Sequence, residues 1–373
     1  MQEIYQKIPE LIENGETGAY CTVVETKGST PQKSGAKLLI LPDLQNIGTL
    51  GGGCVEAEAR QQAIDLIRER TTRLLDFQLD NDYGWGDGLI CGGQMKIFID
   101  LPTSKTEQDL FDSLQRLSVQ KVALYVATVV ESEDTEVQVG QKRLVATNGE
   151  TVGNLGRTTL ETEVHQVASE VLQTNEPLLF KWNSRNGIGP ISVFIEPIQS
   201  RSTLLIAGAG HIGQALCHLG NWTDFDVTVI DDRADLASER YLPDANQIII
   251  GDIATELSQY PIDHLTYVVI VTRGHNHDEE ALHAVINSEA CYIGLIGSRR
   301  KIKLIFDDLI EMGISPERLA QIYAPIGLDI SSKTVPEIAV SIASQLIQVR
   351  NSAKSVNRFE SKPKRMPTIQ AAS

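Results

Sequence analysis

The chain has 373 residues, of which 42 % are apolar, and it carries a formal net charge of -16. The length predicts two or three domains with cores of their own, and the negative charge excludes nucleic acid or an anionic membrane as a main partner because it repels polyanions. With no apolar run near the ~18 residues of a membrane-spanning helix, no signal-peptide pattern, and five cysteines without regular spacing, we expect a cytoplasmic protein.

The first half of the chain predicts an α+β domain over residues 1–198. Apolar residues at helical spacing predict helices over residues 2–13, 55–67 and 159–173. Runs rich in β-branched and aromatic residues predict strands over residues 19–28, 36–43, 73–79, 94–101, 121–130, 142–149 and 191–198. No internal repeat is apparent, and we expect a linker at residues 198–202.

The second half predicts a doubly wound parallel sheet over residues 203–350. Unbroken runs rich in Val and Ile alternate with helical segments, which is typical of strands buried on both faces. The expected strands cover residues 203–208, 226–231, 247–252, 266–272, 291–297 and 320–325. Thr334 and Glu337 form a capping box that predicts the start of a last helix, and residues 351–373 form a polar tail that we expect to be disordered.

The segment LLIAGAGHIGQAL carries the pattern G-x-G-x-x-G and makes the second domain a Rossmann-type domain. In this pattern Gly208 permits the tight turn, Gly210 lets a phosphate approach the backbone, and Gly213 lets helix and strand pack closely. His211 belongs to the same candidate site. Asp231 ends the next strand, where a carboxylate accepts hydrogen bonds from ribose hydroxyls. The alternative is that these glycines serve packing alone.

Two later loops also follow predicted parallel strands, so they belong to the same edge of the sheet. The first is VTRGHNHDEEAL with Arg273 and His275, and the second is IGSRRKI with Ser298 and Arg299. Cations at the start of a helix oppose its dipole, which favours an anionic ligand over a merely solvated helix start. His275 and His277 have no third metal ligand nearby in the sequence, which disfavours a zinc site.

A second glycine turn precedes the predicted helix of residues 55–67 and consists of Gly51, Gly52 and Gly53. Exposed backbone N–H groups at such a turn bind anions. Glu56 and Glu58 lie in the first helical turn, where they already complement the dipole and disfavour a second negative charge. The thiol of Cys54 is drawn toward the thiolate by the helix N-terminus and away from it by these glutamates.

Two cysteines beside glycines, Cys54 and Cys91, suit a soft metal centre or a sulfur-bearing cofactor. The alternative, that they are small residues buried in tight turns, stays open. A cationic loop that would complement a phosphate holds Lys27, Lys33 and Lys37.

Seven motifs occur in an order that resembles the XdhC/CoxI family, the xanthine dehydrogenase accessory proteins. The resemblance spans residues 20–348 and rests on GSTPQKSGAKLLI, GTLGGGCVE, LICGGQMKIFID, LLIAGAGHIGQAL, VTRGHNHD, IGLIGSRRK and PIGLDISSKTVPEIAVSI. It implies an N-terminal XdhC/CoxI domain followed by a Rossmann domain. The sequence departs from the family at Ser331 and Ser332, where glycine and alanine are expected.

The resemblance also implies a function. Such accessory proteins bind molybdenum cofactor (molybdopterin), a phosphorylated pyranopterin dithiolene, support its sulfuration with a cysteine desulfurase, and deliver it to xanthine dehydrogenase-type molybdoenzymes. By this analogy the glycines of GGGCVE, with Cys54 and Glu56, belong to the cofactor surface, and the Rossmann glycines with the TRGH and GSRRK loops contact phosphate or pterin. We therefore expect a non-catalytic chaperone that forms a homodimer.

Two other functions remain open because the Rossmann domain alone permits them. One is an NAD(P)-dependent oxidoreductase and the other is a nucleotide-responsive regulatory protein. No Lys/Asp or Tyr/Lys pair is placed to act as acid and base in hydride transfer, which counts against the oxidoreductase.

Overall fold

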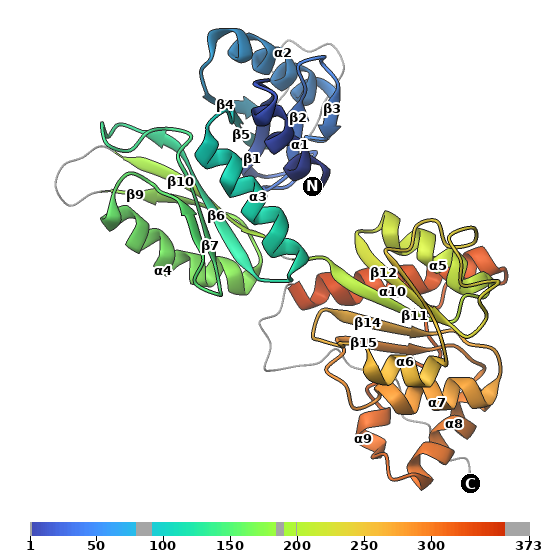
Figure 1. Cartoon of the computed structure of the whole chain (residues 1–373). Helices are drawn as coiled ribbons and strands as arrows, with labels where there is room; N and C mark the ends of the chain where they lie inside the picture. Colours follow the sequence, from blue (N-terminus) through green and yellow to red (C-terminus); the bar gives the residue numbers. More distant parts are fainter. Residues whose placement is uncertain (1, 80–91, 184–189, 199, 355–373) are drawn as a thin grey trace. The chain divides into compact units, whose positions relative to one another are not determined.

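A computed structural model describes residues 2–79, 92–183, 190–198 and 200–354, and the chain divides into two units, Met1–Ser200 and Arg201–Ser373 (Figure 1). Among the described residues, the sheets of the first unit are antiparallel, and the second unit has one parallel sheet. The predicted fold class is therefore confirmed. None of the helices in the described ranges combines the length and apolar character needed to cross a membrane.

The first unit consists of two modules in which the same elements follow one another in the same order. The first module comprises α1 (Gln2–Glu13), β1 (Ala19–Lys27), β2 (Lys37–Ile40), β3 (Asn46–Gly48), α2 (Gly53–Glu69), β4 (Arg73–Gln78) and β5 (Gln94–Asp100). The second comprises α3 (Lys105–Val119), β6 (Leu124–Ser132), β7 (Lys142–Ala146), β8 (Thr151–Gly153), α4 (Thr158–Thr174), β9 (Leu178–Trp182) and β10 (Ile191–Ile198). Their sheets have matching orders, β3-β2-β1-β5-β4 and β8-β7-β6-β10-β9.

Details of the backbone repeat as well. Gly48 and Gly153 both end a strand where an added Cβ would collide with a lysine carbonyl, and α2 and α4 both end at a left-handed residue with φ 54°. The expectation of no internal repeat is thus wrong. The sequence does carry a short signal of the repeat, because GTLGGGCVE and GNLGRTTLE share the pattern G-x-L-G-x-x-x-x-E.

Reciprocal ion pairs join the two modules. Lys37 on β2 lies 2.5 Å from Glu196 on β10, and Lys142 on β7 contacts Asp100 on β5. Both lysine side chains are buried, with exposed fractions of 0 % and 3 %. Lys37 therefore does not belong to a cationic ligand-binding loop as expected, because its charge is neutralised inside the unit.

Each module covers one face of its sheet with its second helix. Apolar residues of α2 pack against Cys21, Leu38 and Ile97 of the first sheet. Apolar residues of α4 pack in the same way against the second sheet. Helices α1 and α3 share a single core between the modules. Helix α3 was not expected from the sequence, although Ser104 and Glu107 form a complete capping box at its start.

The second unit is a five-stranded parallel sheet with helices on both faces. Its strands have the order β13 (Gln247–Ile250), β12 (Phe225–Asp231), β11 (Ser202–Ala207), β14 (Thr266–Ile270) and β15 (Tyr292–Leu295). Helices α5 (His211–Trp222) and α10 (Val335–Lys354) pack on one face, and α6 (Ile253–Gln259), α7 (His275–Val285) and α8 (Arg299–Glu311) pack on the other (Figure 1). The chain reverses its winding direction between β11 and β14, which creates a topological switch point.

Near the C-terminal end of the second unit, one of three expectations from the sequence is confirmed, one is wrong and one is wrong at its boundary. Residues 320–325 do not form the expected sixth strand. They follow the short helix α9 (Pro316–Leu319), and an isolated bridge joins Tyr323 to Gly294 of the sheet. Pro325 lacks the N–H that a longer strand requires.

The capping box of the last helix is confirmed, since Glu337 accepts a hydrogen bond from the Thr334 N–H at 3.0 Å. That helix continues past Arg350 to Lys354, and residues 355–373 lie outside the described ranges.

Candidate functional site

The switch point of the parallel sheet gathers the predicted site residues of the second unit. The turn after β11 carries Gly208 and Gly210, and the segment after β14 carries Arg273 and His275. Strands β12 and β15 end at the same edge with Asp231 and the loop to Ser298. In open parallel sheets this edge is where ligands bind.

The three glycines of the turn have different physical roles. Gly208 has φ 120°, and a Cβ there would lie 2.6 Å from the Val271 carbonyl oxygen. A Cβ at Gly213 would collide with the Gly208 carbonyl. Both glycines are therefore required by packing. Gly210 has an ordinary φ of -70° and open space around it, and it begins α5 without a side-chain cap. The N-terminus of α5 is thus accessible to an anion.

Asp231 is occupied inside the turn. Its two carboxylate oxygens accept hydrogen bonds from the Ala209 N–H at 2.6 Å and from three N–H groups of Arg233 at 2.7–2.9 Å. Burial alone would raise the pKa of Asp231, but these hydrogen bonds lower it to about 2. Asp231 therefore braces the glycine turn as a permanent anion, and its oxygens have little capacity left for a ribose.

The neighbouring Asp232 is more accessible. Its side chain is 35 % exposed and lies 2.6 Å from the guanidinium of Arg273, which is 53 % exposed. This ion pair links the loop after β14 to the end of β12. Arg273 is therefore held at the sheet edge by a partner that an anionic ligand would have to replace or share.

Two cations at the start of α8, Arg299 and Lys301, have different surroundings. The N-cap Ser298 accepts a hydrogen bond from the Lys301 N–H at 3.3 Å, and the Lys301 ammonium contacts Asp278, which is fully buried. Burial raises the pKa of Asp278, although Lys301 and Thr272 lower it. Lys301 is thus internally neutralised. Arg299 is exposed and makes no ion pair within the described ranges, which leaves its charge available to a ligand.

In the first unit, the glycine turn before α2 already holds a carboxylate. Glu56 accepts hydrogen bonds from the Thr49 hydroxyl and the Leu50 N–H, both at 2.7 Å, and from the Gly52 N–H at 3.1 Å. Burial would raise the pKa of Glu56, but these three bonds lower it. Glu56 thus fills part of the position that a bound anion would take, as its place in the first helical turn predicts.

The second module shows which parts of this turn are structural. There Glu161 accepts a hydrogen bond from the Leu155 N–H at 2.9 Å, as Glu56 does from Leu50, and Gly156 has a positive φ like Gly51. The second module then enters its helix through Arg157, with an extended backbone. Positions 52 and 53 are glycines only in the first module.

Gly52 and Gly53 both have positive φ values and open space where a side chain would lie, and Gly52 begins α2 without a side-chain cap. Their positive φ values favour glycine, whereas the second module enters its helix through an extended Arg157 and does not need glycine there. Cys54 follows as a half-buried free thiol. Apart from the Gly52 N–H, which donates to Glu56, the open part of this turn consists of Gly52, Gly53 and Cys54, whereas Cys91 lies outside the described residues.

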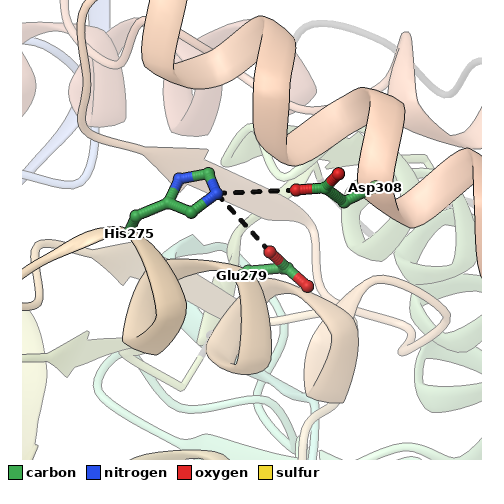
Figure 2. Close-up of side chains that lie close together, drawn as sticks. All are labelled: His275, Glu279 and Asp308. Atoms are coloured by element: carbon green, nitrogen blue, oxygen red, sulfur yellow. Dashed lines mark ion pairs between the residues drawn. The ribbon is translucent and has the colours of Figure 1, made fainter.

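One cluster at the sheet edge was missed. His275 begins α7 close to Glu279 on the same helix and to Asp308 on α8 (Figure 2). The spacing of His275 and Glu279, four residues apart on a helix, was a usable signal. Asp308 had none, because its approach depends on the packing of α8 against α7. His277, by contrast, pairs with Glu280 at 3.8 Å.

Comparison with known families matches both units. The model of the XdhC Rossmann domain matches residues 204–346, and the model of the XdhC and CoxI family matches residues 11–78 and 119–183. The latter ranges cover most of the first and second modules respectively.

Three relatives share sequence with the chain. The uncharacterized protein YqeB of Escherichia coli is 30 % identical over 66 % of this chain, which spans only 47 % of that relative. A probable xanthine dehydrogenase subunit of Bacillus subtilis is 26 % identical over 94 % of this chain and 98 % of the relative. The molybdenum cofactor insertion chaperone PaoD of Escherichia coli is 23 % identical over 91 % of this chain and 86 % of the relative.

A crystal structure described as a xanthine dehydrogenase from Bacillus halodurans has the same fold. It superposes with a TM-score of 0.74 at 22 % identity and covers 95 % of this chain and 98 % of the other. At this identity the likeness concerns the fold alone.

Proposed function

Because this chain belongs to the XdhC and CoxI family, we propose that it binds molybdenum cofactor as cargo and supports its insertion into xanthine dehydrogenase-type molybdoenzymes. The relative named as a molybdenum cofactor insertion chaperone supports the choice of cargo, and the relative named as a xanthine dehydrogenase component supports the choice of client. In this role the protein holds and transfers a cofactor and does not turn over a substrate.

One observation carries the proposal, namely the uncapped N-terminus of α5 at the switch point. Molybdopterin ends in a phosphate, and open space around Gly210 lets the first N–H groups of α5 approach such a group. The exposed guanidinium of Arg299 at the same sheet edge supplies the matching charge. The chain as a whole is strongly negative, so an anionic ligand needs such a local exception.

In the first unit, Gly52, Gly53 and Cys54 form a separate candidate contact for the dithiolene and molybdenum of the cargo. The dithiolene and the molybdenum are soft, and a thiol is a soft donor. Bare backbone at the two glycines permits close approach of a bulky ring system. Glu56 contributes by fixing the turn rather than by binding the ligand.

Cofactor binding by point variants tests the proposal. Molybdenum cofactor released from a purified molybdoenzyme is titrated into the full chain, and Kd is obtained from the bound fraction, measured by pterin fluorescence after separation and oxidation. Arg299→Ala should weaken binding ~10-fold because a charge-assisted hydrogen bond is lost, whereas Lys303→Ala, which removes an exposed cation elsewhere on α8, should not. Equal Kd values for wild type, Arg299→Ala and Lys303→Ala would show that Arg299 does not bind the cofactor.

Metal retention tests the thiol separately. Cys54→Ser should lower molybdenum occupancy more than pterin occupancy, as measured by elemental analysis and by fluorescence after oxidation. Cys217→Ser is the matched control, because Cys217 is buried and burial raises the pKa of its thiol to about 12. Equal molybdenum contents in wild type and Cys54→Ser would contradict the role of the thiol.

A nucleotide is the second candidate ligand, since the strand order and the glycine turn of the second unit are also those of dinucleotide-binding domains. Because the oxygens of Asp231 are occupied, Asp232 is the carboxylate that would bind a ribose. Titration with NAD and NADP, with Asp232→Asn as the variant, tests this: affinity lost in the variant supports a nucleotide site, and no binding to wild type removes it.

Sulfuration of the cargo with a cysteine desulfurase, homodimer formation and a cytoplasmic location complete the proposal. The first two rest on family membership, and the third rests on the sequence patterns and the cysteine usage. Co-purification from cells that express a tagged chain tests the desulfurase contact. Light scattering of the purified chain tests the dimer, and fractionation of the cells tests the location.

A further inference from the structure

Outside the glycine turns, a histidine and two carboxylates converge on the second unit. His275 and Glu279 lie one turn apart on α7, and Asp308 reaches them from α8 (Figure 2). The Nε2 atom of His275 lies 3.7 Å from an oxygen of Glu279 and 3.5 Å from an oxygen of Asp308. All three potential ligand atoms lie within 4.8 Å of one another.

We propose that His275, Glu279 and Asp308 bind a divalent first-row transition metal ion of the Zn²⁺ type. Two ligands of a tetrahedral zinc ion, each about 2.1 Å from the metal, are about 3.4 Å apart. The separations of 3.5 and 3.7 Å around Nε2 are close to this edge length. Small side-chain adjustments would bring the two carboxylates to the same distance from a common centre.

The charge of the cluster favours a cation. With a neutral imidazole, the two carboxylates place two negative charges side by side, and like charges at such short range destabilise one another. A divalent ion neutralises both, and an imidazole nitrogen with two carboxylate oxygens is a donor set that zinc and its neighbours accept. Glu279 has an exposed fraction of 18 %, so part of the cluster is shielded from water.

The site has room for a further ligand. Three protein ligands leave at least one coordination position for water or a bound molecule. Glu279 also lines a surface hollow of about 400 Å³ between α6 and α7, together with Thr255, Ser258 and His283. Since the ion would join α7 to α8, it would also fix the start of α7 beside Arg273, which follows β14 at the sheet edge.

Metal binding by the full chain, freed of metal by chelation, tests the site. Titration with Zn²⁺ should show one stoichiometric site, and Co²⁺ should give visible d–d bands without the near-ultraviolet charge-transfer band of thiolate ligation. His275→Gln and Asp308→Asn should each weaken Zn²⁺ binding by ~100-fold or more, since loss of a direct ligand exceeds the 10–100-fold effect of losing a supporting residue. Zn²⁺ should also raise the melting temperature of wild type but not that of His275→Gln or Asp308→Asn.

His277→Gln is the matched control. His277 lies on the same helix, forms an ion pair with Glu280 and is not part of the cluster. Melting of the metal-free proteins verifies that each variant folds, and Glu279→Gln replaces any that does not. Equal Zn²⁺ affinity in wild type, His275→Gln and Asp308→Asn would show that the cluster is an ion pair and not a metal site. A thiolate band at the stoichiometric site would lead to the same conclusion. None of these measurements depends on the proposed cofactor cargo.

Discussion

Replacing Asp231 by Asn should loosen the second unit while leaving its shape intact. The carboxylate accepts one hydrogen bond from the glycine turn and three from Arg233, and its side chain is 1 % exposed. Its pKa is held at about 2, compared with ~3.9 for an ordinary Asp. A difference of roughly two units corresponds to about 2–3 kcal/mol of stability at pH 7.

Hydrogen exchange of the amides in β11 and β12 measures this loss in the full chain, because these strands report on the second unit alone. Asp232→Asn is the control, since Asp232 is 35 % exposed and its ion pair is worth less than about 1 kcal/mol. The sign of the pH effect follows from the lowered pKa: the stabilisation is present above pH ~4 and is lost as the pH falls towards 2. Equal protection in wild type and Asp231→Asn, or a larger loss in Asp232→Asn, would refute the bracing role.

Gly213→Ala should lower the melting temperature of the second unit because its Cβ would collide with the Gly208 carbonyl. Gly210→Ala should melt like wild type and lose affinity for a phosphate ligand. Calorimetry and ligand titration of both variants check this, and a Gly213→Ala variant as stable as wild type would contradict it. Glu56→Gln should be less stable than wild type at pH 7. Because the wild-type pKa is lowered, urea unfolding at decreasing pH should show the difference closing below pH ~4, and a constant gap down to pH 3 would count against the turn hydrogen bonds. Lys142→Met should cost ~3–5 kcal/mol in urea unfolding at pH 7 because it leaves buried carboxylates without their cation, and a loss below ~1 kcal/mol would show that they are neutral in the folded protein.

Elements with strong local patterns were predictable from sequence. The helix over 2–13, the strands of the parallel sheet up to residue 297 and the capping box at Thr334 all follow from periodicity or from residues a few positions apart. The strand expected at 320–325 did not form because, although Tyr323 hydrogen-bonds to β15, Pro325 lacks the N–H needed to extend that pairing. Helix α3 was missed although its cap was readable.

The candidate site was predictable in its backbone and not in its charges. The glycines at 208, 210 and 213 occupy the turn that their spacing predicts. The sequence could not show that Asp231 and Lys301 are neutralised by internal partners while Arg299 has no ion pair in the described part of the chain. Which cation meets which carboxylate depends on how loops from different strands approach one another.

By itself, the sequence determined where the backbone must turn and which segments are buried, because φ preference and apolar spacing act over a few neighbouring residues. Only the tertiary structure decided that the first unit is a duplicated module, that Lys37 reaches Glu196, and that Asp308 approaches His275. These contacts join residues far apart in the chain. Their energies depend on distance and burial, which exist only once the sheets and helices have packed.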